Sequence, residues 1–259
     1  MLKRILPSLF LSLAIAGHAG ASADPSAIAS LRRELQTAVN RGDASALRSV
    51  RARFSALAQA DPKDARVQYW VAVSSWRVLP FLIGTDKKLA TEIANDAMAR
   101  ADQALAIDSK FAEALAVKAG VQGMMISLEP NSMMTLGPQS GANLARAAGL
   151  QPDNPRIHLL AGISTLHKPA QFGGGAKPSL DEFRRANALF ANEAVPDSTA
   201  PDWGRDDALL WTGRAQMELR DFAAARESFR AAVAANPDNQ WVRYRLLPAA
   251  EDSLAKAKP

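Results

Sequence analysis

The sequence predicts an all-α fold: a right-handed superhelical solenoid of about five helical hairpins, closed by a capping helix at the C-terminus. Apolar residues recur at i, i+3 and i+4 along most of the chain, whereas the strict alternation of a strand never persists. Signals that end a helix also recur, at Pro62, Ser109, Pro152 and Pro237. The spacing between successive signals corresponds to one or two helical hairpins. We therefore expect the same hairpin unit to repeat along the chain.

The expected helices lie between these signals. In chain order they are 26–41 and 44–60, 64–79 and 88–107, 110–126 and 140–150, 155–167 and 179–193, 206–219 and 222–235, and a closing helix over 239–256. The closing helix is apolar on one side and carries Arg243, Arg245 and Glu251 elsewhere, as the last unit of a solenoid requires. Because all pairs share one core, residues 24–259 are expected to form one domain.

The stretch 208–239 carries the most specific pattern. It supplies Gly213, Ala225, Phe229, Ala232 and Pro237 in the order and at the spacing of a tetratricopeptide repeat. Antiparallel helices approach closely only where side chains are small, so we expect Gly213 and Ala225 to face each other, with Phe229 filling the gap toward the neighbouring hairpin. The chain thus resembles the tetratricopeptide family. That resemblance implies a solenoid that presents a binding surface and no reaction centre.

Three internal units are about ten residues longer than the ~34 of a standard repeat. The extra residues lie between the paired helices, at 79–88, 126–139 and 167–178. Insertions at the same point of successive repeats project from one rim of a solenoid. The apolar residues expected to meet on this rim, some of them lining the largest pocket, are Phe81, Leu82, Met133, Met134 and Phe172. The alternative is that the inserts fold back and are buried between hairpins.

Aromatic residues on the helix 64–79 add two further candidates. Trp70 and Trp76 lie on the first helix of the second unit, close to Tyr69. One face of this helix must belong to the core, so at least one aromatic is expected to be structural. The others are candidates for the concave binding surface.

The loop 167–178 places Phe172 before three glycines. Consecutive glycines before a helix suit either an anion cradle or a tight turn that only glycine tolerates. The loop resembles the linkers of envelope tetratricopeptide proteins, including the T-component associated with TRAP-type transporters. That resemblance implies a lipoprotein partner and the handling of apolar ligands.

Residues 1–23 have the pattern of a secretory signal. Lys3 and Arg4 precede an apolar run, and small residues follow, with cleavage expected after Ala23. The alternative, an uncleaved anchor, conflicts with a run shorter than the ~20 residues of a spanning helix. The mature chain is therefore expected to be periplasmic or secreted and not an integral membrane protein. The sequence contains no cysteine, which excludes a lipidated cysteine, disulfides and thiolate metal sites.

The charge of the chain is moderately positive. The formal net charge is +5, of which residues 1–23 contribute two basic groups and no acid, leaving +3. The basic N-terminal third either attracts an anionic partner or forms an ordinary solvated face, since acids are interleaved with the basic residues. Basic residues do not alternate with aromatics, so nucleic-acid binding is not expected.

Motifs for chemistry are lacking in the sequence. His158 and His167 are nine residues apart and do not share a helical face, so no metal site or cofactor is expected. Neither a nucleophile elbow nor a serine with a matched base occurs. We therefore expect a non-catalytic scaffold or adaptor that binds a protein or peptide in the bacterial envelope. The alternatives are a binder of small apolar ligands or lipid that serves a transporter and, third, an enzyme whose site the sequence does not reveal.

Overall fold

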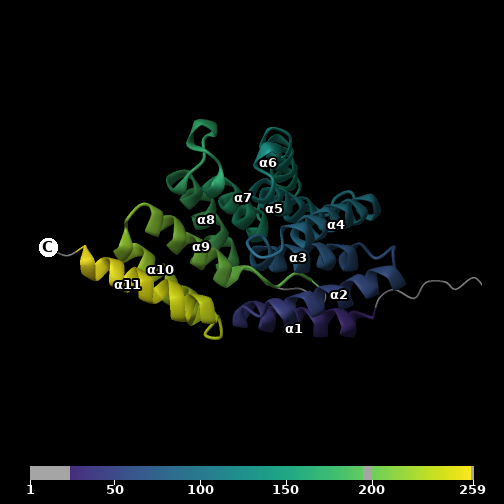
Figure 1. The fold of residues 1–259 in the computed structure, drawn as a ribbon, viewed down its shortest axis with the longest axis horizontal. Coiled ribbons are helices and arrows are strands. Elements are labelled where there is room, and N and C mark those ends of the chain that lie inside the picture. Colours follow the sequence, from purple (N-terminus) through teal and green to yellow (C-terminus); the bar gives the residue numbers. More distant parts are fainter. Residues whose placement is uncertain (1–23, 195–199, 258–259) are drawn as a thin grey trace, which may run out of the picture.

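The computed structural model describes residues 24–194 and 200–257, and within these ranges eleven α-helices pack in sequence order (Figure 1). The helices are α1 (Pro25–Arg41), α2 (Ala44–Ala60), α3 (Ala65–Leu82), α4 (Lys87–Ile107), α5 (Ala112–Leu128), α6 (Met133–Leu150), α7 (Pro155–His167), α8 (Ala176–Ala191), α9 (Arg205–Glu218), α10 (Phe222–Ala235) and α11 (Leu247–Lys256). Successive helices pair as hairpins, α1 with α2 through α9 with α10, and α11 covers the last hairpin. The expected all-α hairpin solenoid is confirmed. None of these helices is long and apolar enough to cross a bilayer.

Short polar side chains begin many of the helices. An Asp or Asn immediately before the helix accepts a hydrogen bond from a backbone N–H of the first turn, which would otherwise lack a partner. The residues that cap in this way are Asp24, Asp43, Asp64, Asp86, Asn154 and Asp221. These caps explain why hairpins follow one another after turns of only a few residues.

The last hairpin contains the predicted repeat pattern. Ala225, Phe229 and Ala232 are fully buried, and Pro237 follows Asn236, the C-cap of α10. A Cβ placed on Gly213 would lie 2.5 Å from Cε1 of Phe229, and its three nearest neighbours all belong to that ring. The ring of Phe229, from the partner helix of the same hairpin, therefore occupies the space beside this glycine.

The α7–α8 hairpin repeats this arrangement. A Cβ on Gly162 would lie 2.4 Å from Cε1 of Phe183, and Ser179 and Ala186 are fully buried beside it. These four residues occupy the places of Gly213, Phe229, Ala225 and Ala232. The pattern was missed in the sequence because the insert between α7 and α8 changes the spacing between the glycine and the aromatic.

Two of the three expected inserts are mostly helical, which corrects the predicted boundaries. Helix α5 continues to Leu128 and α6 already begins at Met133, with Pro138 inside it; α3 likewise continues past Pro80. A proline in a helix removes one backbone hydrogen bond, and here packing along the paired helix outweighs that loss. Only the α7–α8 connection, with its 3₁₀ turn Ala170–Phe172, has the expected loop character.

The C-terminal segment is also not one regular helix. A π-helical turn, Val242–Leu246, precedes α11, and Pro248 stands in the first turn of α11. Because Pro248 has no N–H to donate, the α-helical ladder is interrupted at this point. The turn leaves Trp241 and Tyr244 exposed.

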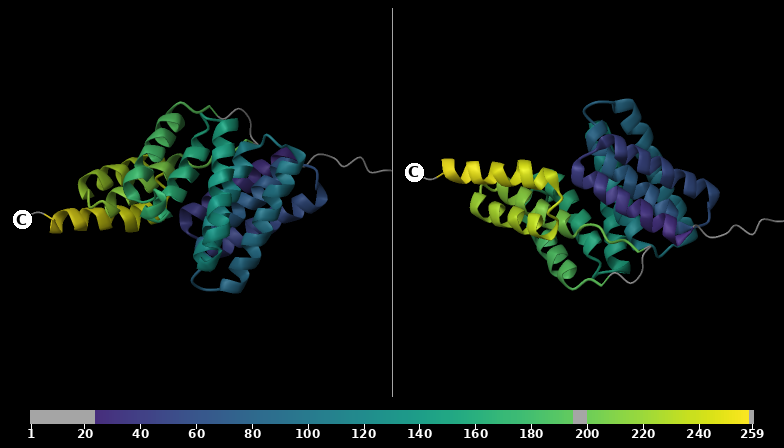
Figure 2. Two further views of the ribbon diagram at one scale, coloured as in Figure 1. Left: turned by 90° about the horizontal axis from the view of Figure 1, so that it is seen from above. Right: turned by 90° about the horizontal axis from the view of Figure 1, so that it is seen from below.

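The two ends of the solenoid meet. The C-terminal end of α1 lies beside the turn after α10 (Figure 1), and the view from below shows the same proximity (Figure 2). Asn40 Nδ2 donates to Asn236 Oδ1 at 3.3 Å and Asn236 Nδ2 to Asn40 Oδ1 at 2.9 Å. Asn236 also donates to Asp206 at 2.7 Å. The first and last hairpins are thus joined across 196 residues of sequence.

Candidate functional site

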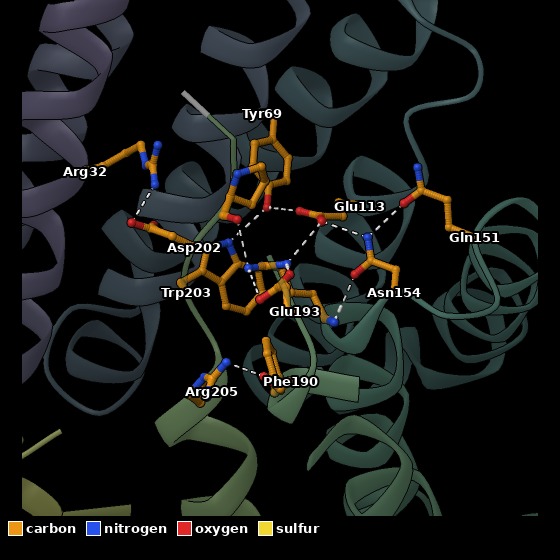
Figure 3. A network of polar contacts seen from close by, with 12 residues as sticks. Arg32, Tyr69, Glu113, Gln151, Asn154, Phe190, Glu193, Asp202, Trp203 and Arg205 are labelled. Carbon is orange, nitrogen blue, oxygen red and sulfur yellow. Dashed lines mark hydrogen bonds and ion pairs between the residues drawn. The ribbon is translucent and has the colours of Figure 1, made fainter. Parts of the chain in front are cut away.

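A buried polar network lies where α3, α5 and α7 meet the segment that leads into α9 (Figure 3). These are the first helices of three successive hairpins, and the segment 200–204 crosses them in an extended form. Trp203 of this segment is buried, and its ring centre lies 5.4 Å from that of Trp76. The chain itself therefore fills this part of the inner surface.

Trp203 starts a chain of hydrogen bonds through the network. Its Nε1–H donates to Tyr69 Oη at 2.9 Å, and Tyr69 donates to Glu113 Oε2 at 2.7 Å. The other oxygen of Glu113 accepts from Asn154 Nδ2 at 2.8 Å. Burial, together with the Glu113 charge, raises the pKa of Tyr69 well above its usual value. Tyr69 is therefore a protonated donor and not a base.

Arg156 is the buried cation of the network. Its guanidinium donates to both carboxylate oxygens of Glu193 and, through Nη2, to the Pro201 carbonyl at 2.8 Å. Glu113 lies 3.6 Å away. Burial lowers the pKa of Arg156, but these carboxylates outweigh it, so its pKa lies above the ordinary value. The fork geometry of arginine suits such a bidentate contact, which fixes α7 to the segment before α9.

Two further arginines anchor the same region. Arg77 forms a bidentate contact with Asp207 at the start of α9, and Arg32 of α1 lies 2.5 Å from Asp202. Each buried cation of the network therefore has a carboxylate partner, as a desolvated charge requires. This arrangement provides neither a free nucleophile nor a poised base. The described residues also contain no group of three or more His, Asp or Glu side chains that could hold a metal ion.

A hollow of about 560 Å³ opens beside the network, lined by Glu113, Asn154, Arg156, Glu193 and Pro201, among others. A second hollow of about 310 Å³ lies between α1 and α2, lined by residues that include Arg33, Glu34 and Asp43. None of the binding residues predicted from the sequence lines either hollow.

Three of the predicted binding residues belong to the core. Trp70, Trp76 and Leu82 are buried. Trp70 stacks on Phe54 with ring centres 5.9 Å apart, and Trp76 packs on Trp203. Aromatics on the inner face of α3 are thus covered by α2 and by the segment before α9. A partner has no access to them in this structure.

The remaining four stay at the ends of the hairpins. Met134 is 78% exposed and Phe172 58% exposed, while Met133 is partly covered. Phe81 is 39% exposed and lies over the α1–α2 turn, where a Cβ on Gly42 would be 3.9 Å from its ring. The structure therefore leaves Phe81, Met134 and Phe172 at the turns of three successive hairpins.

The glycines after Phe172 form a tight turn. Gly173 and Gly175 have positive φ angles of 79° and 112°. A Cβ on Gly174 would lie 1.9 Å from the carbonyl oxygen of Lys168. The tight-turn alternative considered for this loop accounts for all three glycines.

A second cluster, around Arg214 of α9, was not predicted. The Arg214 Cζ lies 4.2 Å from the ring centre of Trp211 and 5.7 Å from that of Trp241. The ring of His167 meets Trp211 edge-on at 5.7 Å. The i, i+3 spacing of Trp211 and Arg214 was a signal in the sequence, but Trp241 directly precedes the π-helical turn, whose position no periodicity indicated.

Comparisons with known proteins bear on the fold. No protein-family model matches the sequence, and no curated protein does. The solved structure of the HusA haemophore from Porphyromonas gingivalis is similar, with a TM-score of 0.62 and 22% identity over 78% of this chain and 96% of that one. TTC0263, a thermophilic TPR protein of Thermus thermophilus, has a TM-score of 0.59 and 13% identity over 87% of this chain and 99% of that one. This chain therefore has a tetratricopeptide-like fold.

Proposed function

We propose that this chain is a non-catalytic scaffold that binds a protein or peptide partner in the bacterial envelope. The observation that carries the proposal is that an exposed apolar side chain lies at the turn of each of three successive hairpins: Phe81, Met134 and Phe172. Exposed apolar groups are a common feature of interaction surfaces, and a methionine adapts its shape to a partner. The buried arginines of the inner network, by contrast, are already paired with carboxylates.

The envelope part of the proposal rests on the signal pattern of residues 1–23, which lie outside the described residues. The position of Asp24 is consistent with cleavage after Ala23. Its carboxylate caps α1 by accepting a hydrogen bond from Ser26 N at 2.9 Å. A mature chain that begins at Asp24 keeps this cap. Mass spectrometry of the exported protein is expected to find Asp24 at the N-terminus, and an intact Met1 on that protein would contradict the proposal. The resemblance of the Phe172 loop to T-component linkers favours a lipoprotein as the partner.

The test is a photo-crosslinking comparison in envelope extract. Crosslinker placed at Met134 or Phe172 is expected to capture one recurrent protein, and the double variant Met134→Ser/Phe172→Ser is expected to lose that protein in a pull-down. The matched control is Ile107→Ser/Leu150→Ser, because these exposed apolar residues end α4 and α6 at the opposite ends of the hairpins.

Both variants change exposed positions, so their thermal midpoints are expected to stay close to that of the wild type. Equal retention of the partner by both variants would contradict a binding role for the turns. Co-purified lipid in place of protein, detected by mass spectrometry, would instead support the small-ligand alternative.

A further inference from the structure

Arg214 is the exception among the buried and partly buried cations of the described residues. Every other described Arg or Lys side chain that is buried or partly buried has a carboxylate within 4.0 Å, as Arg77 has Asp207 and Arg156 has Glu193. Arg214 is partly buried and forms neither an ion pair nor a hydrogen bond with any described residue. A cation that loses water without gaining a partner is held at a cost.

The neighbours of Arg214 offset only part of this cost. Its guanidinium stacks on Trp211 at 4.2 Å and lies 5.7 Å from Trp241, both within the range of a cation–π interaction. Glu218, one turn further along α9, is the acid whose charge acts on it, yet does not pair with it. Burial lowers the pKa of Arg214, which is the signature of a charge without an adequate counter-ion. The flat faces of the guanidinium contact the indole rings. Its N–H groups lie in the plane of the guanidinium and can still donate hydrogen bonds to an anion.

We infer that Trp211, Arg214 and Trp241 form a binding site for the carboxylate of an aromatic compound. The guanidinium edge matches the two oxygens of a carboxylate, which would accept a bidentate pair of hydrogen bonds. The exposed indole of Trp241 supplies a flat apolar surface on which an attached ring stacks at about 4.5–7 Å, the usual spacing of aromatic pairs. Trp241 is 45% exposed, so this wall of the site faces solvent. The inference does not rest on the exposed turns and stands whether or not they bind a protein.

Binding of 2-naphthoate, measured by calorimetry and by the indole N–H signals of Trp211 and Trp241, tests the inference. Saturable binding that shifts both signals is expected. The matched probes are 2-naphthylmethanol, which has the ring without the charge, and acetate, which has the charge without the ring. Both are expected to bind at least tenfold more weakly. Equal binding of 2-naphthylmethanol would overturn the carboxylate assignment, and so would the absence of any saturable binding of 2-naphthoate.

The source of the carboxylate is distinguished by a second pair of probes. The peptide Gly-Gly-Trp with a free C-terminus is compared with its C-terminal amide. The amide lacks the carboxylate and is expected to bind more weakly than the free peptide. Tighter binding of the free peptide than of 2-naphthoate assigns the site to a peptide terminus, and tighter binding of 2-naphthoate assigns it to a small aromatic acid. Both orders support the shared chemistry.

Arg214→Gln is the decisive variant, and Arg243→Gln is its control. Arg243 also lies over an aromatic ring, Tyr244 at 5.4 Å, but it is exposed and has one ring beside it. Arg214→Gln is expected to weaken naphthoate binding at least tenfold, whereas Arg243→Gln binds like the wild type. Equal binding by the two variants would overturn the inference. If Arg214→Gln does not fold, Trp241→Ala replaces it, and unchanged affinity in that exposed variant has the same meaning.

Discussion

At the scale of single residues, glycine decides how closely two helices approach. Gly162 and Gly213 each lie under the ring of a phenylalanine from the partner helix, Phe183 and Phe229. Both rings are fully buried, so they have no open space into which to move. A methyl group at either glycine must therefore displace a ring that the core already encloses.

Gly162→Ala is expected to destabilise the protein by about 1–3 kcal/mol, the usual cost of overpacking a core. Gly123→Ala is the control, because a Cβ at that helical position meets nothing within 4 Å. That change is expected to stabilise by up to about 1 kcal/mol, since alanine favours helix more than glycine does. Urea unfolding of both variants measures the difference. Equal midpoints would show that Phe183 moves freely.

A histidine provides a pH dependence of stability. His158 Nδ1 lies 2.7 Å from Glu182 Oε2, and its Nε2 lies 2.8 Å from the Pro152 carbonyl oxygen. Both acceptors favour the doubly protonated ring. The Glu182 hydrogen bond, followed by that to Pro152, raises the pKa of His158 above 6.5 although burial opposes it.

Because the folded pKa exceeds the unfolded one, this pair stabilises the protein fully below the unfolded pKa near 6.5 and loses its contribution as pH rises through the folded pKa. We expect the free energy of unfolding of the wild type to fall over that window relative to His158→Gln. Urea titrations between about pH 5 and 9, which bracket the ordinary histidine pKa, provide the measurement. Parallel curves for the two proteins would contradict the pairing.

At the scale of elements, the segment before α9 acts as part of the core. Trp203 packs on Trp76 and donates to Tyr69, and Arg156 holds the carbonyl of Pro201. This loop thus packs against the inner helices as the face of a helix does elsewhere in the solenoid. This explains why α3 is buried on nearly all sides.

Trp203→Ala is expected to cost about 3–5 kcal/mol, as the loss of a large buried aromatic does. Trp203→Phe keeps a ring and removes only the N–H donor, while Tyr69 retains its bond to Glu113. That change is expected to cost less, with about 0.5–1.5 kcal/mol from the lost hydrogen bond. Denaturation followed by far-UV circular dichroism compares them. Similar small losses for both would mean that the segment is not anchored by the ring.

The helices could largely be predicted from the sequence, whereas the site could not. Periodicity and helix-ending signals predicted 44–60, 155–167 and 222–235 to the residue. The prediction was wrong where Pro138 was taken to precede a helix, because packing overrides a local signal. The polar network was missed because its bonds join residues far apart in sequence, 37 positions for Arg156 with Glu193 and 134 for Trp203 with Tyr69. No local spacing predicts which buried charges will pair across a solenoid.

At the scale of the whole molecule, the contact between Asn40 and Asn236 joins the two ends. The two amides exchange hydrogen bonds, and Asp206 holds Asn236 in place. Stacked repeats otherwise interact only with their neighbours. This contact, together with the ion pair of Arg32 and Asp202, therefore links the first hairpin to the C-terminal part of the solenoid.

A double-mutant cycle with Asn40→Ala and Asn236→Ala is expected to give an interaction energy of about 0.5–3 kcal/mol, the range for residues in direct contact. Ser45→Ala with Asn236→Ala is the control, since Ser45 is exposed at the start of α2 and is expected to be additive. Free energies of unfolding from urea titration give both cycles. Additive changes in the free energy of unfolding for Asn40→Ala and Asn236→Ala would contradict a stabilising contact between these two residues.

The meeting of the ends also sets an order of events in time. Segments 196 residues apart rarely collide in an unfolded chain, since the entropic cost of closing a loop grows with its length. Hairpins form sooner, from neighbours in sequence. Each hairpin that stacks on the previous one brings α1 and α10 closer together. Little conformational entropy then remains to be lost when their ends make contact. Because the contact of Asn40 with Asn236 depends on the stacking of all the hairpins between them, we expect it to form late in folding and to open before any hairpin unravels.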